Sequence, residues 1–385
     1  MTRTYDVAVI GLGAMGAAAL YQLSKQNLKV IGIDKYTPPH AYGSSYGETR
    51  VTRQAIGEGT FYTPMVLRAN EIWAELEKFS GKELYGHCGM LIAAHREQRF
   101  LQNTLKAAED YHIQHEVLNG QEVERRFPAL KVADKDHTFY YEPTSGYLRP
   151  EACIEAELKL AQDNGAELLT DTEVTSIQEG DEGVKITLAT NEEITAQKVI
   201  VASGSWIKDM LPDSLGNVLT TLLQTLYWFD IDLAYYDQLT PDKFPVFLCG
   251  DEKSEVTRSF YGFPVLGGPH GGMKFAVHET DKEVRPADKD TATPVTSAED
   301  IYTFISRYVR GLKPDALRSA NCLYTMTPDE NFIIDFKPGS KRIVMVSACS
   351  GHGFKHSAAV GEMASELAVS GKTTLDSSPF RLDRF

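Results

Sequence analysis

The glycine-rich turn at residues 11–16 constrains the fold more than any other feature of this chain. The apolar segment 5–10 predicts a short buried strand, and residues 14–26 predict a helix directly after it. Gly11, Gly13 and Gly16 have the spacing GxGxxG where the strand passes into the helix. A strand, a turn of this spacing and a helix together predict the first unit of a nucleotide-binding βαβ fold.

Each glycine of the turn has its own physical reason. Gly11 permits the tight turn, Gly13 lets the backbone approach a pyrophosphate, and Gly16 lets helix and strand pack closely. The helix N-terminus offers unpaired N–H groups and a partial positive charge to the phosphates. Asp34 follows the second predicted strand, 28–33, where its carboxylate would bind a ribose 2′-OH and disfavour a 2′-phosphate. A dinucleotide ligand is therefore predicted, and a purely structural βαβ unit is the alternative.

The size, charge and cysteine content exclude several classes of protein. A chain of 385 residues predicts two domains. The net charge of −14 and a pI near 5.2 argue against nucleic acid or an anionic membrane as partners. No apolar run is long enough to span a membrane and no signal peptide is visible, so a cytoplasmic protein is expected. Five scattered cysteines without a CxxC spacing predict neither disulfides nor a metal site.

The periodicity of the remaining chain predicts two sheets. Helices are expected at about 62–79, 99–110, 120–127, 150–164, 297–310 and 357–370. The first sheet would gain a parallel strand at 167–170, a meander at 173–179, 183–189 and 193–196, and buried strands at 198–203 and 342–347. Alternating segments at 220–232 and 255–278 predict a second, antiparallel sheet.

These segments predict a discontinuous organisation. A Rossmann-like nucleotide-binding domain would comprise residues 1–85, 145–215 and 320–385, and a substrate domain would comprise residues 86–144 and 216–319. The expected fold class is therefore α/β, with a mainly antiparallel sheet in an α+β second domain. A cleft between the two domains is the expected place for a small-molecule site.

The second half of the chain favours FAD over a nicotinamide nucleotide. The strand at 198–203 ends in Gly204-Ser205-Trp206, and the strand at 342–347 runs into a glycine-rich turn at 350–355 before a helix. These segments resemble those of two-domain flavoproteins, which bind FAD in an extended form, with ADP on the first βαβ unit and the flavin ring against a late segment. A nicotinamide dehydrogenase does not need this late return to the first sheet.

Several motifs in a fixed order resemble one family of flavoproteins. They are GLGAMGAAALYQL at the start, PPHAYGSSYGETRVTRQAIGEG at 38–59, YGFP at 261–264, MKFAVH at 273–278, NCLYTMTPDENFIID at 321–335 and SGHGFKHS at 350–357. Over its whole length the chain resembles the family of monomeric sarcosine oxidase and N-methyltryptophan oxidase, which are glutathione-reductase-like amine oxidases. The closing PFRLDRF is similar to N-methyltryptophan oxidase in particular.

The resemblance implies FAD as the cofactor in a Rossmann-like domain, beside a substrate domain. The residues expected to bind the cofactor are Gly11, Gly13, Met15, Gly16, Asp34, Lys35, Ser44, Arg50, Val174, Gly204, Cys322, Gly351, Gly353 and Lys355.

Two arginines and one lysine are the candidate anion ligands. Arg50 and Arg53 lie three residues apart and would share one face of a helical turn, although two solvated surface arginines are the alternative. Lys355 precedes a helix, where a cation is unfavourable unless an anion lies nearby. The resemblance implies that Arg53 and Lys355 bind a substrate carboxylate and that Arg50 lies near the flavin and tunes its reactivity.

Lys274 and His278 alternate along one predicted strand and would point to the same face. A lysine on a strand is by itself more typical of a solvated edge. The resemblance implies instead that Lys274 lies near flavin N5 and promotes the reduction of O₂. It also implies that His278, Tyr261 and Tyr324 line the substrate side and position the amine.

Cys322 and two glycines complete the expected site. An isolated cysteine before a leucine is normally a small buried core residue. The resemblance implies a thioether between Cys322 and the flavin 8α-methyl group, and a close approach of the flavin to Gly351 and Gly353. The chain departs from the family pattern where Ser45 and Tyr46 replace two histidines near the expected flavin ring.

The resemblance implies a monomeric oxidase of a secondary amino acid. Sarcosine is the leading substrate: its oxidation gives an imine that hydrolyses to a primary amino acid and formaldehyde, while O₂ becomes H₂O₂. N-methyltryptophan, pipecolate and fructosyl amino acids stay open as substrates. A flavin dehydrogenase with another electron acceptor and a non-catalytic flavin-binding protein are the remaining alternatives.

Overall fold

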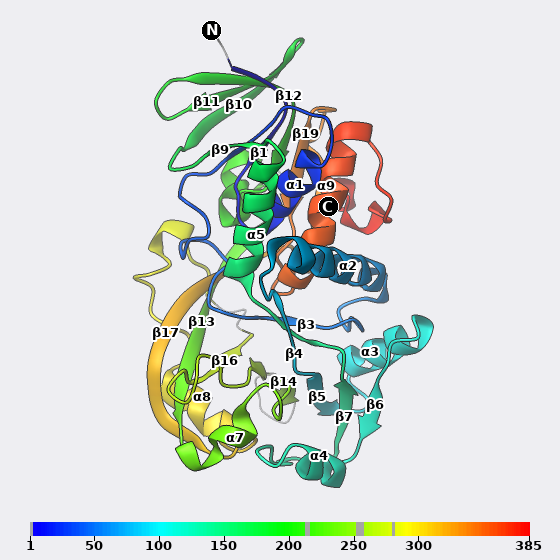
Figure 1. Cartoon of the computed structure of the whole chain (residues 1–385), viewed down its shortest axis with the longest axis vertical. Helices are drawn as coiled ribbons and strands as arrows, with labels where there is room; N and C mark the ends of the chain where they lie inside the picture. Colours follow the sequence, from blue (N-terminus) through cyan, green and yellow to red (C-terminus); the bar gives the residue numbers. More distant parts are fainter. Residues whose placement is uncertain (1–2, 212–215, 252–257, 279–281) are drawn as a thin grey trace.

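The structure is a computed structural model in which residues 3–211, 216–251, 258–278 and 282–385 are described. Figure 1 shows two large sheets at opposite ends of an elongated molecule, with helices gathered beside the first sheet. Within the described residues, no helix combines the length and apolar character that crossing a membrane requires.

The first sheet contains the predicted βαβ unit. Strand β1 (Arg3–Ile10) leads into α1 (Ala14–Ser24) and then into β2 (Val30–Ile33), which pairs with β1 in parallel. The sheet order is β10 (Val174–Gly180), β11 (Gly183–Leu188), β12 (Glu193–Val201), β1, β2 and β9 (Glu167–Leu169). Strand β19 (Ile343–Ser347) pairs with β12, and β18 (Ile333–Phe336) pairs with β19.

Strand β12 is one continuous element where the sequence predicted two. It pairs with β1 from Ile194 to Val201. On its other edge it pairs with β11 as far as Ala196, and from Val199 onward it pairs with β19. The separate strands expected at 193–196 and 198–203 are therefore wrong, because the neighbour changes along this edge while the strand itself continues.

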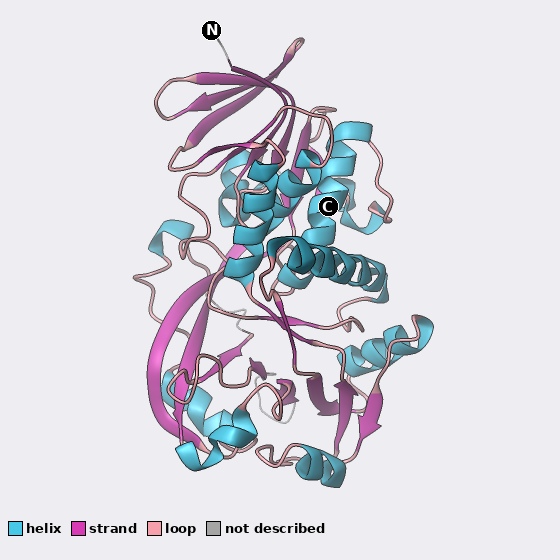
Figure 2. Ribbon diagram, viewed as in Figure 1, coloured by secondary structure: helices cyan, strands magenta, loops and turns pink. Residues whose placement is uncertain are grey.

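The helices cover the first sheet as a packed layer (Figures 1 and 2). Helix α1 contacts both α5 (Pro150–Asp163) and α9 (Ser357–Ser370), and α2 (Thr63–Ser80) packs against α5 and α9. Small residues bring α1 and α9 together: a Cβ atom added to Gly361 would lie only 2.4 Å from the Cβ of Ala18. This contact fixes the helix that follows the glycine-rich turn against the helix that follows Lys355.

The second sheet is mainly antiparallel, which confirms the predicted fold class. Its order is β17 (Leu312–Met326), β13 (Thr220–Ile231), β16 (Met273–Val277), β15 (Arg258–Gly262), β14 (Val246–Asp251), β5 (Met90–His95), β7 (His137–Glu142) and β6 (Glu116–Leu118). Only β14 and β5 pair in parallel within this described sheet. Of the predicted segment 255–278, residues 255–257 lie outside the described part of the chain.

A small third sheet lies between the two large ones in Figure 1. It consists of β3 (Arg50–Thr52), β8 (Gly146–Leu148) and β4 (Tyr85–His87). The other α-helices of the described residues are α3 (Arg99–Asp110), α4 (Gly120–Arg126), α7 (Tyr236–Leu239) and α8 (Ala298–Ile305). Helix α8 ends at Ile305 and is shorter than the expected 297–310; beyond its end, Val309 pairs with Leu130.

The predicted domain boundaries stay predictions. The first sheet draws its strands from three separate stretches of the chain, as expected for a discontinuous domain. The expected boundary between residues 319 and 320, however, falls inside β17, which crosses from one end of the molecule toward the other (Figure 1).

Candidate active site

A cavity of about 730 Å³ extends from the glycine-rich turn after β1 to the glycine-rich turn after β19. Nearly all of the predicted site residues line it, although they come from distant parts of the chain. These residues are Gly11, Gly13, Met15, Asp34, Lys35, Ser44, Arg50, Arg53, Val174, Gly204, Tyr261, His278, Cys322, Tyr324, Gly351, Gly353 and Lys355. Gly16 and Lys274 are not part of the lining.

The glycine-rich turn has the geometry that a pyrophosphate requires. Gly11 has a φ of +88°, and a Cβ atom there would lie 2.6 Å from the carbonyl oxygen of Ala202. A Cβ atom at Gly13 would meet nothing closer than Ser45 Oγ at 3.8 Å, so the space before this backbone is open. A Cβ atom at Gly16 would lie 1.7 Å from the Gly11 carbonyl oxygen, which accounts for its absence from the lining. The residues present therefore fit a dinucleotide.

Asp34 lines the cavity and also holds the turn in place. Its Oδ2 accepts a hydrogen bond from the backbone N–H of Leu12 at 2.6 Å, and its Oδ1 accepts one from Tyr36 at 2.8 Å. The neighbouring Lys35 pairs with Glu173 at 2.8 Å. Each carboxylate oxygen can accept a further hydrogen bond, and the predicted ribose contact stays a prediction.

Arg53 and Lys355 meet the carboxylate of Glu58 at the other end of the cavity. Both cationic side chains are about 3% exposed. Arg53 forms a salt bridge with Glu58 Oε2, and the Nζ atom of Lys355 lies 3.8 Å from Glu58 Oε1. Lys355 also donates a hydrogen bond to the His352 carbonyl at 2.7 Å. One protein carboxylate thus bridges the two cations that were predicted to bind a substrate carboxylate.

The pKa values of Lys355 and Glu58 are both lowered, but for different reasons. Burial lowers the pKa of Lys355 to about 7, and Arg53 adds to this shift while Glu58 opposes it. Burial alone would raise the pKa of Glu58, but Arg53 and Lys355 outweigh it and hold that pKa well below its usual range. Glu58 is therefore ionised, and Lys355 changes its charge close to neutral pH.

Arg50 lies beside Cys322 rather than on a helical turn. Arg50–Thr52 forms strand β3, so the predicted helical face shared with Arg53 is wrong, and neither arginine is a solvated surface residue. The guanidinium of Arg50 donates to the carbonyl of Ser44 at 2.6 Å, and its Nη2 lies 3.7 Å from Cys322 Sγ. The guanidinium therefore places a positive charge beside the sulfur atom.

Lys274 is buried behind the cavity wall. Its Nζ atom donates to the carbonyl oxygens of Gly47 and Thr49 at 2.8 and 2.7 Å, and it lies 4.2 Å from the ring centroid of Phe263. Burial lowers the pKa of Lys274 well below its usual value, and Arg50 lowers it further. The alternative of a solvated edge lysine is wrong, since β16 lies inside the sheet and the side chain is about 3% exposed.

An aromatic wall faces the turn that contains Gly351. The rings of His278 and Tyr324 lie 5.3 Å apart, and the hydroxyls of Tyr324 and Tyr261 share a hydrogen bond. Gly351 has a φ of +76°, and a Cβ atom there would lie 2.7 Å from His278 Cε1. Burial raises the pKa of both tyrosines. The structure therefore brings these predicted residues together.

Sequence reasoning missed Glu58. Glu58 could have been found as the acid closest to Arg53 in the segment that follows it, because two buried cations require an anion. Ser45 lines the cavity, whereas Tyr46 is not in the lining and donates its hydroxyl proton to the carbonyl of Asn321.

The family follows from a comparison with known proteins. Residues 6–367 match the family model described as FAD dependent oxidoreductase. The chain belongs to this family, and the prediction of FAD rather than a nicotinamide nucleotide is confirmed.

Full-length relatives place the chain more closely. It is 36% identical to monomeric sarcosine oxidase from Bacillus sp. (strain B-0618), over 100% of this chain and 97% of that protein. It is 34% identical to N-methyl-L-tryptophan oxidase from Yersinia pestis (strain Pestoides F), over 99% of both. The solved structure of NikD, an unusual amino acid oxidase, has the same fold, with a TM-score of 0.83, 22% identity and 99% and 98% of the two chains covered. The predicted family is confirmed.

Proposed function

We propose that this FAD-dependent oxidoreductase oxidises an N-methyl amino acid, with sarcosine as the first candidate, to a primary amino acid and formaldehyde while O₂ becomes H₂O₂. The observation that carries the proposal is the pair of buried cations, Arg53 and Lys355, in the cavity that also contains the glycine-rich turn. Such a pair favours a carboxylate, which every amino acid carries. The names of the two full-length relatives support an N-methyl group on that amino acid.

The substrate carboxylate would replace Glu58. Arg53 would then bind it through two parallel N–H groups, and Lys355 would supply a third donor. Neither cation would be left unpaired before or after the exchange, which avoids the large cost of an isolated buried charge. The side chain of Glu58 is 23% exposed, so it has a route into water when it leaves.

FAD, when bound, supplies the two-electron chemistry that protein side chains lack. The residues that would hold its ADP half are Gly11, Gly13 and Asp34, which surround the open space before α1. Gly351 and Gly353 would accommodate the flavin at the other end of the same cavity.

Tyr261, Tyr324 and His278 would orient the substrate amine. Because burial raises the pKa of both tyrosines, each hydroxyl keeps its proton at neutral pH. The hydroxyls would therefore act as hydrogen-bond partners and not as bases. Together with the ring of His278 they would exclude water from the reacting carbon.

Arg50 and Lys274 would supply positive charge to the reaction with O₂. Both are held by backbone carbonyls, so their positions change little during the reaction. Fixed charges near a developing negative charge lower its free energy without reorganisation. This arrangement favours an oxidase over a dehydrogenase that passes electrons to another acceptor.

Cys322 would carry the flavin through a thioether. Its side chain is buried, lines the cavity and lies beside Arg50. Cys322→Ala is expected to give protein whose flavin is released by acid, while Cys349→Ala keeps its flavin attached. Release of flavin from the unchanged protein by acid would contradict the attachment.

We further propose that the protein acts as a monomer in the cytoplasm. The cavity is lined by residues of one chain, so no partner is needed to complete it. All five cysteines are free thiols, which suits a reducing compartment.

The visible spectrum during anaerobic mixing tests the proposed reaction. The flavin band should bleach with sarcosine or a bulkier N-methyl amino acid, and air should restore it with release of H₂O₂. The same amines without the carboxylate, and the same amino acids without the N-methyl group, serve as matched controls. A yellow protein that no N-methyl amino acid bleaches would contradict the substrate and leave FAD binding intact.

A further inference from the structure

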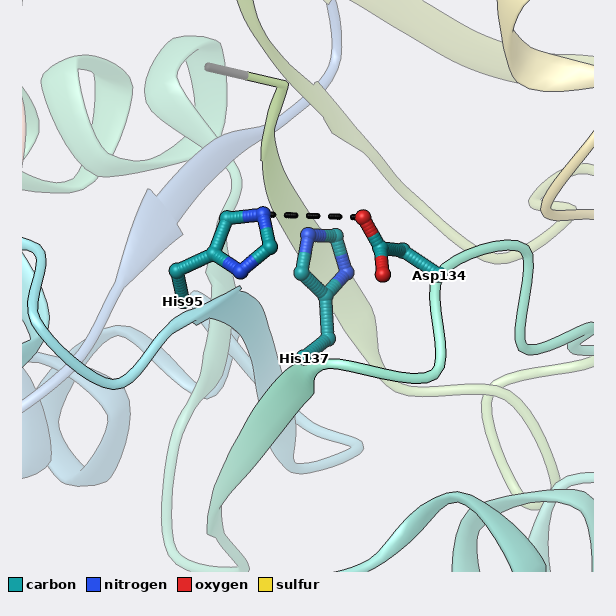
Figure 3. Close-up of side chains that lie close together, drawn as sticks. All are labelled: His95, Asp134 and His137. Atoms are coloured by element: carbon teal, nitrogen blue, oxygen red, sulfur yellow. Dashed lines mark ion pairs between the residues drawn. The ribbon is translucent and has the colours of Figure 1, made fainter. Parts of the chain in front are cut away.

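Two histidines and an aspartate gather outside the cavity. His95 ends β5, His137 begins β7, and Asp134 lies in the turn just before β7. Figure 3 shows the three side chains pointing toward one another. One ligand atom of each lies within 4.8 Å of those of the other two, and His95 Nε2 is 3.5 Å from Asp134 Oδ2.

We propose that this cluster, His95, Asp134 and His137, binds a divalent transition metal ion of the zinc class. Imidazole nitrogens suit zinc, nickel and copper, whereas magnesium and calcium prefer oxygen ligands alone. Two histidines and one carboxylate are a set of three ligands that zinc accepts with water in the fourth position. The predicted absence of a metal site rested on the spacing of cysteines and did not consider histidines.

The backbone arranges the two imidazoles for a shared ligand. His95 and His137 are directly opposite each other in the antiparallel pair of β5 and β7. Opposite residues of such a pair project from the same face, with Cβ atoms roughly 5 Å apart. The two rings accordingly lie 4.8 Å apart between centroids, in an edge-to-face arrangement.

The distances and exposure suit an ion that enters from water. Zinc bonds of about 2.0–2.1 Å put tetrahedral ligand atoms roughly 3.4 Å apart. The His95–Asp134 separation of 3.5 Å already matches this value, and small side-chain rotations would bring His137 into place. The side chains of His95 and Asp134 are 21% and 17% exposed, so water can reach the ion and complete its coordination.

A bound ion would join two parts of the chain beside the cavity. Ala94, the residue before His95, lines the cavity, and so does Gln98, whose backbone N–H donates to the His95 carbonyl at 3.0 Å. The ion would therefore tie this wall to the turn that contains Asp134. It would stabilise the fold without contacting substrate or flavin, so this proposal does not depend on the proposed reaction.

Zinc binding to the FAD-loaded protein tests the site. After treatment with a chelator, equilibrium dialysis against Zn²⁺ should load one ion per chain, and Mg²⁺ at the same concentration should load none. His95→Gln and Asp134→Asn keep the size of each side chain and remove one metal ligand. Each should weaken zinc binding by at least ~100-fold, because the loss of a ligand costs at least as much affinity as the loss of a residue that only supports a ligand. His270→Gln, which removes an exposed histidine outside the cluster, should bind zinc like the unchanged protein.

The unfolding temperature gives a second measurement. Zn²⁺ should raise it in the unchanged protein and in His270→Gln, because an ion that binds only the folded state stabilises it. The rise should be absent in His95→Gln and Asp134→Asn. Absence of zinc binding to the unchanged protein, or equal binding by the cluster variants, would overturn the proposal.

Discussion

The regions around Lys274 and Lys355 balance a buried positive charge in different ways. Both lysines are about 3% exposed, and burial lowers the pKa of both. Lys274 donates to two backbone carbonyls, which carry no net charge and cannot leave. Lys355 faces the carboxylate of Glu58, a full charge on a side chain that is partly exposed.

This difference indicates which lysine can bind an anionic substrate. A lysine held by fixed carbonyl dipoles keeps its place, so its ammonium group supplies a local field of fixed position. A cation paired with a movable carboxylate can exchange that partner for another of the same chemistry. We therefore expect changes near Lys355 to alter substrate binding and changes near Lys274 to alter the reaction with O₂.

The largest effect is expected from Arg53→Met. The variant loses the bidentate partner and leaves Glu58 and Lys355 to pair with each other, so substrate carboxylates lose their strongest ligand. The dissociation constant should rise roughly 10²- to 10⁴-fold, as for other buried charge pairs. Spectral titration of the flavin with a carboxylate that cannot be oxidised measures it, and Arg68→Met on the surface of α2 is the control. An unchanged constant would place the carboxylate elsewhere.

Lys274→Met should separate the two half-reactions. Removal of a fixed charge near developing negative charge typically costs about 10²-fold in rate. Reoxidation of the reduced protein by O₂ should therefore slow by about 100-fold, while anaerobic reduction by substrate changes little. Stopped-flow measurement of each step checks this expectation. Equal slowing of reduction and reoxidation would contradict a role of Lys274 in the reaction with O₂ alone.

Substrate binding should weaken as the pH rises through about 7. The pKa of Lys355 is lowered to about 7, so its ammonium is present below that pH and is lost above it. A substrate carboxylate that accepts a hydrogen bond from Nζ would lie closer than Glu58, whose Oε1 is 3.8 Å away, so it raises this pKa and binding takes up a proton. The dissociation constant of a simple carboxylate should rise by up to ~10-fold per pH unit above 7. Lys355→Met should give a weaker but flat profile, and a pH profile that this variant leaves unchanged would contradict the assignment.

Glu58→Gln is expected to give the smallest change in affinity, in the opposite direction. The neutral amide no longer competes with the substrate, so carboxylates should bind a few-fold to about 10-fold more tightly. Without a ligand, the Glu58→Gln variant should unfold at a lower temperature than the unchanged protein, and an added carboxylate should raise its unfolding temperature again. Glu142→Gln is the matched control, because the buried carboxylate of Glu142 accepts hydrogen bonds from Gln54 and Ala55 N–H groups and contacts no cation among the described residues. Carboxylate rescue of both variants alike would contradict an exchange at Glu58.

The elements that the sequence predicted well are those set by local interactions. The strand, turn and first helix are confirmed within two residues, since the glycine spacing and the apolar pattern act over short distances. Helices α3 and α9 have the predicted bounds. Strand β17 was not predicted, because its first half is polar and largely exposed and its partner β13 lies about 90 residues earlier.

The residues of the candidate site were predicted from the sequence, but the ion pairs and hydrogen bonds between them were not. Family motifs gave Arg53, Lys355 and Cys322, and all three line one cavity. The roles assigned to them stay predictions. The contacts of Glu58 with Lys355 and of Lys274 with backbone carbonyls form only when distant segments of the chain come together. A backbone carbonyl is present in every residue, so the sequence does not indicate which of them accepts a hydrogen bond.

The contact between Gly361 and Ala18 determines how long a ligand the cavity can hold. Helix α1 starts at the glycine-rich turn, and α9 starts just after Lys355, so the spacing of the two helices sets the span from pyrophosphate to substrate. A side chain at position 361 would press on the backbone of α1 as well as on the Ala18 methyl group. An enzyme altered there would keep every chemical group it needs and would hold them at the wrong separation for its cofactor.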